Sequence, residues 1–406
     1  MMAATKSYSY FKFKWRNFIY ATAGLLLLLS NIFVLSHIIL ATDILSRKPA
    51  ARCACDASRL SKSASPEDAF SNTNNPLFTP QGLEKLISEN PYPRLYEPDF
   101  TGLQSLCQST RWQQHVYMSC TENPGGLMNV QNAVLNCIRY AIESGATGLI
   151  LPKVQIRSSQ NLTELRSGDH RRLARTFRRR FDDLLDSLPT SPSEQHPVIF
   201  GLDDKMLFSF PPDTDVPTVS QNFGFILEFR RDLSSLAALA VSRLQKILDR
   251  SKTEKKYLGL HLRTESDVPK GWSSFRTYGE TALSTALDNG ISVIYVASGD
   301  SEGIEKLRQA VAEYEIAVTS KWRLLTADEQ EYLHSFTFDQ QAIVDYLVLL
   351  QADMFIGSPE SSFSSQLVLR RELISGDIAV RDWRYIDETN RLVGKGVFDY
   401  ADMQWS

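Results

Sequence analysis

The amino-acid sequence predicts an α/β protein of two halves, preceded by a single N-terminal transmembrane helix and a flexible stalk. Three observations lead to this fold class. Short apolar runs alternate with helix-patterned segments beyond residue 96, residues 17–42 contain no Asp, Glu, Lys or Arg, and residues 43–95 are rich in Ser, Asn and Pro without a sustained period. We divide the chain into a cytosolic tail, a signal anchor, a stalk, an N-terminal α/β half and a C-terminal α/β half with the ligand site, at residues 1–16, 17–42, 43–95, 96–235 and 236–406.

Composition and charge exclude several classes of protein. The 406 residues hold 44 Lys and Arg against 47 Asp and Glu, a net charge of −3, whereas a nucleic-acid-binding protein is expected to carry a strong basic excess. A hydrophobic content of 43% with 22% charged residues is typical of a globular chain that buries a core. Five cysteines are too few for a scaffold built on disulfides. We therefore expect a globular body that binds no nucleic acid.

Residues 17–42 are long enough to cross a bilayer. A helix needs about 20 apolar residues to span the hydrocarbon core. The basic residues that precede this segment, with no acid among them, favour a cytosolic N-terminus and a translocated body. A cleaved signal peptide, whose apolar stretch is shorter, and a buried core helix are the alternatives. We expect a single-pass type II protein of secretory-pathway membranes, in the Golgi or the endoplasmic reticulum.

Two further features fit a luminal body. Asn161-Leu-Thr is an N-glycosylation sequon. Cys107, Cys120 and Cys137 could include a disulfide in an oxidising compartment, and the sequence leaves the pairing open.

The N-terminal half begins with a glycine turn and a helix. The pair Gly125-Gly126 precedes a segment whose apolar residues recur at helical spacing from Val130 to Ile142, and Gly145 is placed to end this helix. Short apolar strands are expected over 147–152 and 197–201. A glycine loop, a helix and an apolar strand in succession indicate α/β layers.

An arginine-rich segment, residues 166–180, lies between these two strands. We interpret it as the solvated face of a helix, and an anion-binding platform is the alternative. The apolar residues expected to form the buried stripe of this helix are Leu173, Phe177, Phe181 and Leu184.

The C-terminal half alternates strands and helices more regularly. Strands are expected over 257–263, 293–297 and 354–357, and helices over 278–287, 301–314, 340–350 and 364–371. Strand–helix alternation at this spacing predicts a parallel sheet. Ligands of such sheets bind beyond the carboxyl ends of the strands, so the residues just after each strand are the candidates for a site.

Two of these strand ends carry suitable chemistry. His261 and Arg263 lie two positions apart along a strand and so point to the same side, with Asp267 close behind. An arginine there can grip a phosphate with two parallel hydrogen bonds, and a structural ion pair is the alternative. After the later strand, Ser361 and Ser362 open a helix whose free backbone N–H groups suit an anion, with a simple helix cap as the alternative. Asn129, beyond the glycine pair, is expected to project towards the same ligand.

No other chemistry has comparable support. The chain lacks the GxxxxGK[ST], GxGxxG, HExxH and GxSxG motifs, and its six histidines have no metal-ligand spacing. Asp213-Thr-Asp215 is a DxD that could hold a divalent metal against a nucleotide-sugar diphosphate, but it stands in a proline-flanked loop. We expect no metal and no other cofactor.

Three segments, taken in order, resemble the GDP-fucose protein O-fucosyltransferase family and its fungal relatives. They are Gly125 to Asn129, His261 to Asp267, and a block from Val344 to Ser364 in which Asp345 stands sixteen residues before Ser361. The resemblance covers roughly residues 120–385. It implies a GT-B fold, in which two Rossmann-like halves face a cleft, and transfer of fucose from GDP-fucose with inversion and without a metal.

The resemblance also implies roles for single residues. Arg263 would hold the β-phosphate and stabilise the GDP leaving group, with His261 and Asp267 lining the donor site. Asn129 and the glycine pair, Gly125 and Gly126, would face the fucose. Arg263 and Asn129 are thus the expected catalytic residues.

The third segment would complete the donor site. Ser361, Ser362 and Phe363 would bind the diphosphate and nucleotide, and Asp345 would support the pocket or serve the structure of its helix. The expected partners are the nucleotide-sugar donor, a glycoprotein or glycan acceptor, and the membrane through residues 17–42. A GT-B transferase that uses another nucleotide sugar, and a catalytically silent luminal binding protein, are the alternative functions.

Overall fold

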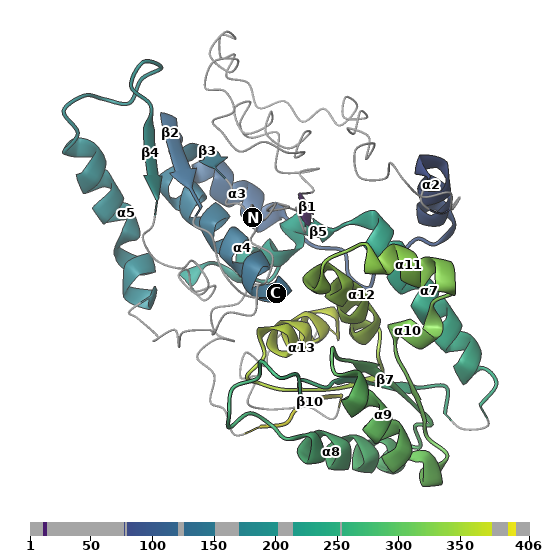
Figure 1. The fold of residues 1–406 in the computed structure, drawn as a ribbon. Coiled ribbons are helices and arrows are strands. Elements are labelled where there is room, and N and C mark those ends of the chain that lie inside the picture. The colour runs from purple at the N-terminus through teal and green to yellow at the C-terminus, as the bar shows by residue number, and fades with distance from the viewer. Residues whose placement is uncertain are drawn as a thin grey trace, which may run out of the picture.

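The structure, a computed structural model, describes residues 11–13, 77, 79–120, 126–150, 170–201, 214–251, 254–375 and 389–394. Figure 1 shows two α/β halves, with a three-stranded sheet in one and a five-stranded sheet in the other, and α4, α12 and α13 between them. Both sheets are parallel, as the sequence predicts.

The N-terminal half is built on the sheet β3-β2-β4. Its strands are β2 (Gln113–Ser119), β3 (Ala146–Ile150) and β4 (Val198–Gly201), and its helices include α3 (Thr101–Ser109), α4 (Leu127–Ser144), α5 (His170–Asp186) and α6 (Pro217–Ser220), followed by the 3-10 turn η5 (Phe223–Ile226) and by β5 (Leu227–Phe229). The expected helix and both expected strands are confirmed. The central strand β2 was not predicted, because polar residues interrupt its apolar pattern.

Helix α4 ends where the glycine pattern predicts. Gly145 adopts a left-handed φ of +70°, and a Cβ at this position would lie 2.1 Å from the carbonyl oxygen of Arg111. Glycine alone accepts both conditions without strain. The helix therefore turns back at once into β3.

The arginine-rich segment forms α5, as interpreted. Phe177 and Phe181 are buried, and Phe177 packs edge-on against Tyr140 of α4. The assignment of Leu184 to the buried stripe is wrong, since this residue is 48% exposed. Leu185 packs against the core in its place, because from Phe181 the stripe continues at i+4 rather than i+3.

The expected stalk ends earlier than predicted. Residues 80–89 form α2 (Pro80–Glu89), in which the Thr79 side chain caps the helix by accepting from the N–H of Gly82. Leu83 and Leu86 are buried in the same core cluster as the residues of α7 (Arg231–Leu248). This segment belongs to the folded body.

The C-terminal half is a five-stranded sheet in the order β10-β9-β6-β7-β8. Its strands are β6 (Tyr257–His261), β7 (Val293–Ala297), β8 (Ala317–Thr319), β9 (Met354–Gly357) and β10 (Asn390–Leu392), and its helices are α8 (Phe275–Asp288), α9 (Ser301–Ala310), α10 (Lys321–Leu324), α11 (Ala327–His334), α12 (Phe338–Leu350) and α13 (Ser362–Ser375), with the 3-10 turn η6 (Ala312–Tyr314) after α9. The expected strands and helices of this half are present, but β6 ends at His261 rather than at residue 263, and the helix expected over 301–314 ends at Ala310.

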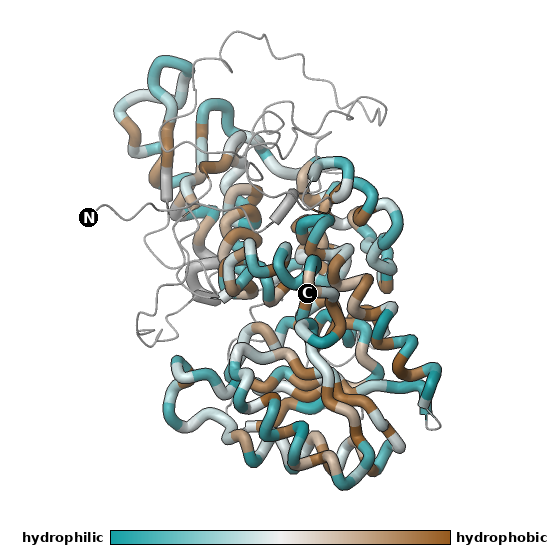
Figure 2. Tube along the Cα trace, turned by 45° about the vertical axis from the view of Figure 1, so that its right-hand side comes forward, coloured by the Kyte–Doolittle hydropathy of each residue, from teal (hydrophilic) through white to brown (hydrophobic). Residues whose placement is uncertain are grey.

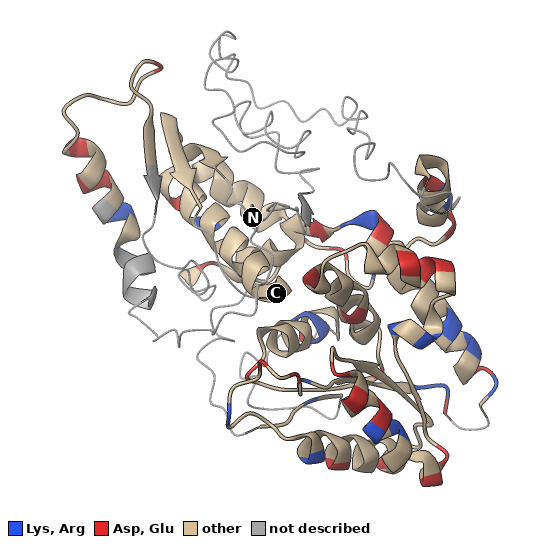
Figure 3. Cartoon of the chain, viewed as in Figure 1, with Lys and Arg blue, Asp and Glu red and all other residues tan. Residues whose placement is uncertain are grey.

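Helices cover both faces of this sheet. All residues of β6 and β7 are buried, as in parallel sheets that have helices on each side. Figure 2 shows these hydrophobic strands within helices that turn hydrophilic faces outward. In Figure 3, acidic and basic residues are intermixed on α9, whereas the charged residues of α11 are acidic.

The N-terminal segment is described only over β1 (Phe11–Phe13), which pairs antiparallel with β5. This pairing was not expected, because residues 1–16 are predicted to lie across a membrane from the body. Within the described residues no helix is long and apolar enough to span a bilayer. Residues 17–42 lie outside them, and the signal anchor stays a prediction.

One disulfide joins Cys120, just after β2, to Cys137 in α4, and the third candidate, Cys107, is free and buried. The bond closes a loop that contains the glycine turn and the first turns of α4. Burial raises the pKa of Cys107 to about 12, so this thiol is inert at neutral pH.

We expect the double variant Cys120→Ser/Cys137→Ser to lose about 3 kcal/mol in its free energy of unfolding, the loop-closure value for a loop of this length. Urea unfolding of the full-length protein measures the loss. Reductant should destabilise the wild type and Cys107→Ala equally and leave the double variant unchanged. Equal stability of the wild type and the double variant would contradict the prediction.

Candidate functional site

The strand order of the C-terminal sheet fixes where a ligand site is expected. From β6 the chain proceeds outward to β7 and β8, and then returns to place β9 on the other side of β6. A crevice opens at such a reversal, outside the carboxyl ends of the two strands that flank it. The site is therefore expected between the segments that follow β6 and β9.

Arg263 follows β6 and has a bidentate partner. Its two terminal nitrogens donate to the two carboxylate oxygens of Asp267 at 2.8 and 3.0 Å, and one also donates to Glu265 at 2.6 Å. Burial works to lower the pKa of Arg263, but the two carboxylates outweigh it and raise the pKa. The guanidinium is thus permanently charged, with its fork turned to a residue that is 43% exposed.

Glu265 fixes this arginine from the protein side. Its carboxylate also accepts from the N–H of Gly299, just beyond β7, at 2.7 Å. Burial works to raise the pKa of Glu265, but the charge of Arg263 and this N–H hold it below its usual value. Through its bonds to Arg263 and to the N–H of Gly299, Glu265 ties the segment after β6 to the loop after β7.

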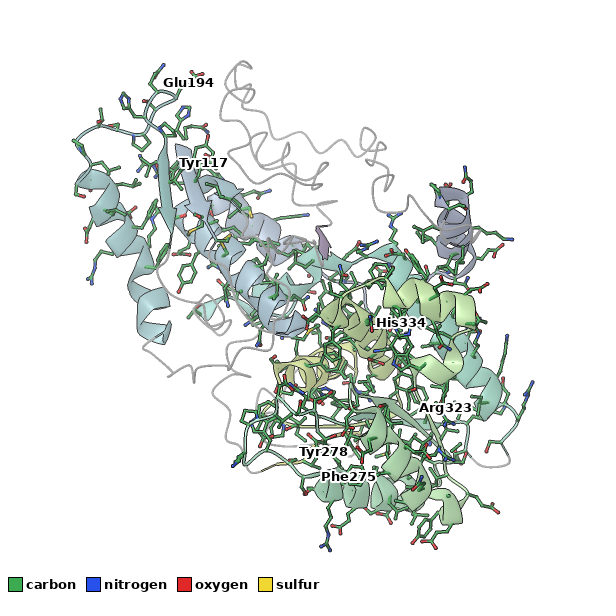
Figure 4. All side chains as sticks on the ribbon, viewed as in Figure 1. Tyr117, Glu194, Phe275, Tyr278, Arg323 and His334 are labelled. Atoms are coloured by element: carbon green, nitrogen blue, oxygen red, sulfur yellow. A yellow bond between two sulfur atoms is a disulfide. The ribbon has the colours of Figure 1, made fainter. Side chains whose placement is uncertain are left out.

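Residues 358–364, which follow β9 and include four serines, are called the serine-rich turn. Ser364 joins this turn to β6. The Ser364 hydroxyl lies 2.7 Å from Nδ1 of His261 and accepts from the N–H of Ser358 at 3.1 Å. The Ser358 hydroxyl in turn donates to Glu360. Beneath this turn lies Tyr278 of α8, labelled in Figure 4, whose pKa burial raises to about 12. The structure thus brings together the two strand ends that the sequence singles out.

His261 and Phe363 support this turn from inside. Their ring centroids are 4.5 Å apart, and Phe363 also meets Tyr346 of α12 edge-on at 5.4 Å. His261 is 8% exposed, and burial lowers its pKa to about 4, so the imidazole is neutral at pH 7. Both side chains hold the turn in place. Ser361, which is buried, and Ser362 lie where α13 begins.

The Asp345 side chain is buried beneath the surface at which a ligand would bind. Its carboxylate accepts from the hydroxyl of Tyr295 at 2.7 Å and pairs with Lys321. Burial raises the pKa of Asp345, against the opposing effect of the Lys321 charge. Of the two interpretations of this residue, the structure favours the structural one, a buried ion pair that ties α12 to β7 and α10.

The glycine turn lies at the contact between the halves. Gly126 precedes α4, and the position of a Cβ on it would be 3.7 Å from the Asp339 carboxylate in the first turn of α12. Asn129 is half-buried in the first turn of α4, which packs against α12 and α13. Gly125 is outside the described residues, as is Asn161.

The DxD is not arranged as a metal site in the part that is described. Asp215 receives two hydrogen bonds of 2.7 Å from Arg139, and both side chains are buried. Asp213 lies outside the described residues. Among the residues that the structure covers, no group of three or more His, Cys, Asp and Glu side chains is placed to hold a metal ion.

Several residues of the site were not singled out from the sequence. Glu265 stands two residues after Arg263, a spacing that places both on one side of an extended chain and could have indicated the pair. Ser364 was quoted only as part of a motif, and its bond to His261 spans 103 residues. No local pattern indicates a contact at that separation.

Comparison with known proteins bears on the C-terminal half. Residues 273–374 match the family described as GDP-fucose protein O-fucosyltransferase, so the resemblance expected from the motifs is confirmed over this segment. The match includes the serine-rich turn and α12. None of the curated proteins matches the chain.

Solved structures of fucosyltransferases are similar at low identity. They include POFUT1 in complex with GDP (12% identity, TM-score 0.36, covering 64% of this chain and 96% of that one) and the fucosyltransferase NodZ from Bradyrhizobium (12%, 0.33, 65% and 93%). A mutant of Arabidopsis thaliana FUT1 in complex with GDP is a third (13%, 0.35, 72% and 76%).

Proposed function

Because residues 273–374 match the GDP-fucose protein O-fucosyltransferase family, we propose that this chain is a glycosyltransferase that moves fucose from GDP-fucose to a hydroxyl group of a protein or glycan. The observation that carries the proposal is that the serine-rich turn is bonded to His261, two residues before Arg263, at the reversal of strand order. We propose a GT-B arrangement, with the donor bound by the C-terminal half.

A diphosphate would need the Arg263 fork, which Asp267 now occupies. A phosphate that takes the Arg263 fork replaces the exposed Asp267, while Glu265 keeps the guanidinium in place from behind. Ser361 and Ser362, with the backbone N–H groups at the start of α13, would contact the remaining phosphate oxygens. The donor would then lie across β6 and β9.

The proposed transfer inverts the anomeric carbon. The acceptor oxygen attacks from the face opposite GDP and gives its proton to water, the bond from the sugar to the β-phosphate oxygen breaks, and negative charge grows on the diphosphate. Arg263 is placed to neutralise this charge, which is why we propose a reaction that needs no metal. Asn129 and the glycine turn, at the contact between the halves, are proposed to face the fucose.

We also propose that the body is luminal and anchored by residues 17–42, a topology that separates β1 from β5 and so excludes their pairing in the membrane-anchored protein. The apolar length of that segment, the sequon at Asn161 and the Cys120–Cys137 disulfide support this, since disulfides form in oxidising compartments. Glycosidase digestion of the protein made in membranes tests it. A luminal body should be glycosylated at Asn161 and lose the modification in Asn161→Gln.

A thermal-shift experiment tests the donor. GDP at 100 times its dissociation constant should stabilise the full-length protein by about 2.7 kcal/mol, with or without a chelator. A response to UDP with manganese alone would favour another nucleotide sugar and revive Asp213 and Asp215. The absence of any nucleotide response would favour a silent binding protein.

A further inference from the structure

Phe338 is an exposed aromatic side chain beside the proposed donor site. It is the first residue of α12, and it is 53% exposed, whereas later apolar residues of the helix such as Ile343 and Val344 are buried. The helix does not need it as a cap, since Thr337 and Gln340 form a reciprocal capping box. Neither capping nor burial in the core accounts for this side chain.

The ring of Phe338 lies over Gly299, at the carboxyl end of β7. Its Cε2 and Cζ atoms are 2.9 Å from where a Cβ of Gly299 would stand, so any larger residue there would displace the ring. The N–H of the same glycine donates to Glu265, and Glu265 bonds Arg263. Phe338 is thus separated from the proposed phosphate-binding guanidinium by one glycine and one carboxylate.

We propose that Phe338 is the surface on which the nucleobase of the donor stacks, an inference that rests on the proposed function. Nucleobases are flat and stack on exposed aromatic rings whatever hydrogen-bond donors and acceptors they carry. With the diphosphate across β6 and β9, Phe338 lies on the other side of β6, next to β7, where the nucleoside would extend.

The other aromatic residue expected at the nucleotide is less suited. Phe363 has its ring against His261 and Tyr346 and packs on the hydrophobic core. Its role in this arrangement is to support the serine-rich turn. A base is therefore better placed on Phe338, which is a substrate-binding residue in this proposal and takes no part in bond breaking.

Calorimetric titration of the full-length protein with GDP and with inorganic pyrophosphate tests the proposal. Phe338→Ala should bind GDP about tenfold more weakly, the scale of one lost base–aromatic stack, and should bind pyrophosphate as the wild type does. Phe338→Trp should retain GDP affinity. Tyr314→Ala removes an exposed aromatic residue that precedes the amino end of β8, whereas the proposed site lies at the carboxyl ends of the strands, and should change neither affinity.

The outcomes separate this inference from the proposed function. Unchanged GDP affinity in Phe338→Ala, with GDP bound by the wild type, overturns the stacking role alone. Equal loss of GDP and pyrophosphate affinity also overturns it, because the variant then acts on the diphosphate site. A wild type that binds neither GDP nor any other nucleoside diphosphate overturns both proposals. If the wild type binds another nucleoside diphosphate instead of GDP, and Phe338→Ala binds that nucleotide more weakly but pyrophosphate equally well, the stacking role is supported and the donor is a different nucleotide sugar.

Discussion

Replacing Arg263 with alanine is expected to lower the rate of fucose transfer by about 10²–10³, the scale of losing one principal electrostatic donor at a transition state. The guanidinium is charged, held by Glu265 and turned to an exposed partner, so it is ready to meet the charge that develops on the diphosphate. Initial rates with GDP-fucose and a suitable acceptor measure the effect.

Two variants make this result specific. Arg263→Lys should recover little activity, because a point charge cannot reproduce the planar fork that Asp267 now occupies. Arg276→Ala removes an exposed arginine whose ion pair with Glu280 lies on the surface of α8, and should leave the rate unchanged. Thermal melting confirms that each variant is folded. A folded Arg263→Ala protein with nearly wild-type transfer would rule out the assignment.

The second large effect concerns stability. Lys321→Met should lower the free energy of unfolding by about 3–5 kcal/mol, because it leaves the buried Asp345 carboxylate without its cation. The double variant Lys321→Met/Asp345→Leu removes both charges and should recover most of this loss. Chemical denaturation of the three proteins measures both values.

An exposed ion pair serves as the control. Lys306 and Glu302 form a salt bridge on α9 and are 58% and 78% exposed, so Lys306→Met should leave the unfolding curve unchanged. If Lys321→Met is as stable as the wild type, the pair is not buried in solution. If the double variant is no better than the single one, the loss comes from packing or from the hydroxyl of Tyr295 rather than from an unpaired charge.

The elements that the sequence predicts correctly are those with strong local periodicity. Strands β7 and β9 and helix α4 have continuous apolar patterns bounded by glycine or polar residues, and their limits fall within three residues of those expected. The elements not predicted include α3, α7, α11 and β8, as well as strand β2 and helix α2. Half of β2 faces away from the core, and α2 has only two buried residues, so tertiary contact decides both.

The same division holds at the site. Arg263 and the serine-rich turn were predicted because each follows a recognisable strand. What each of them bonds could not be predicted, since His261 and Ser364 meet through the strand order of the sheet, and Asp345 finds Lys321 on another helix. Phe338 and Gly299 are adjacent only in space. Local patterns thus indicated which groups carry the chemistry, and topology determined how they are held.

The placement of β9 beside β6 has a consequence for synthesis. About 90 residues separate the end of β6 from the start of β9, so a ribosome adding about 5–20 residues per second needs roughly 5–20 s to complete the pairing. During that interval one edge of a strand that is wholly buried in the folded protein has no neighbour, the condition under which nascent chains aggregate. Chaperone binding to the growing polypeptide should therefore be strongest while residues 262–353 are emerging.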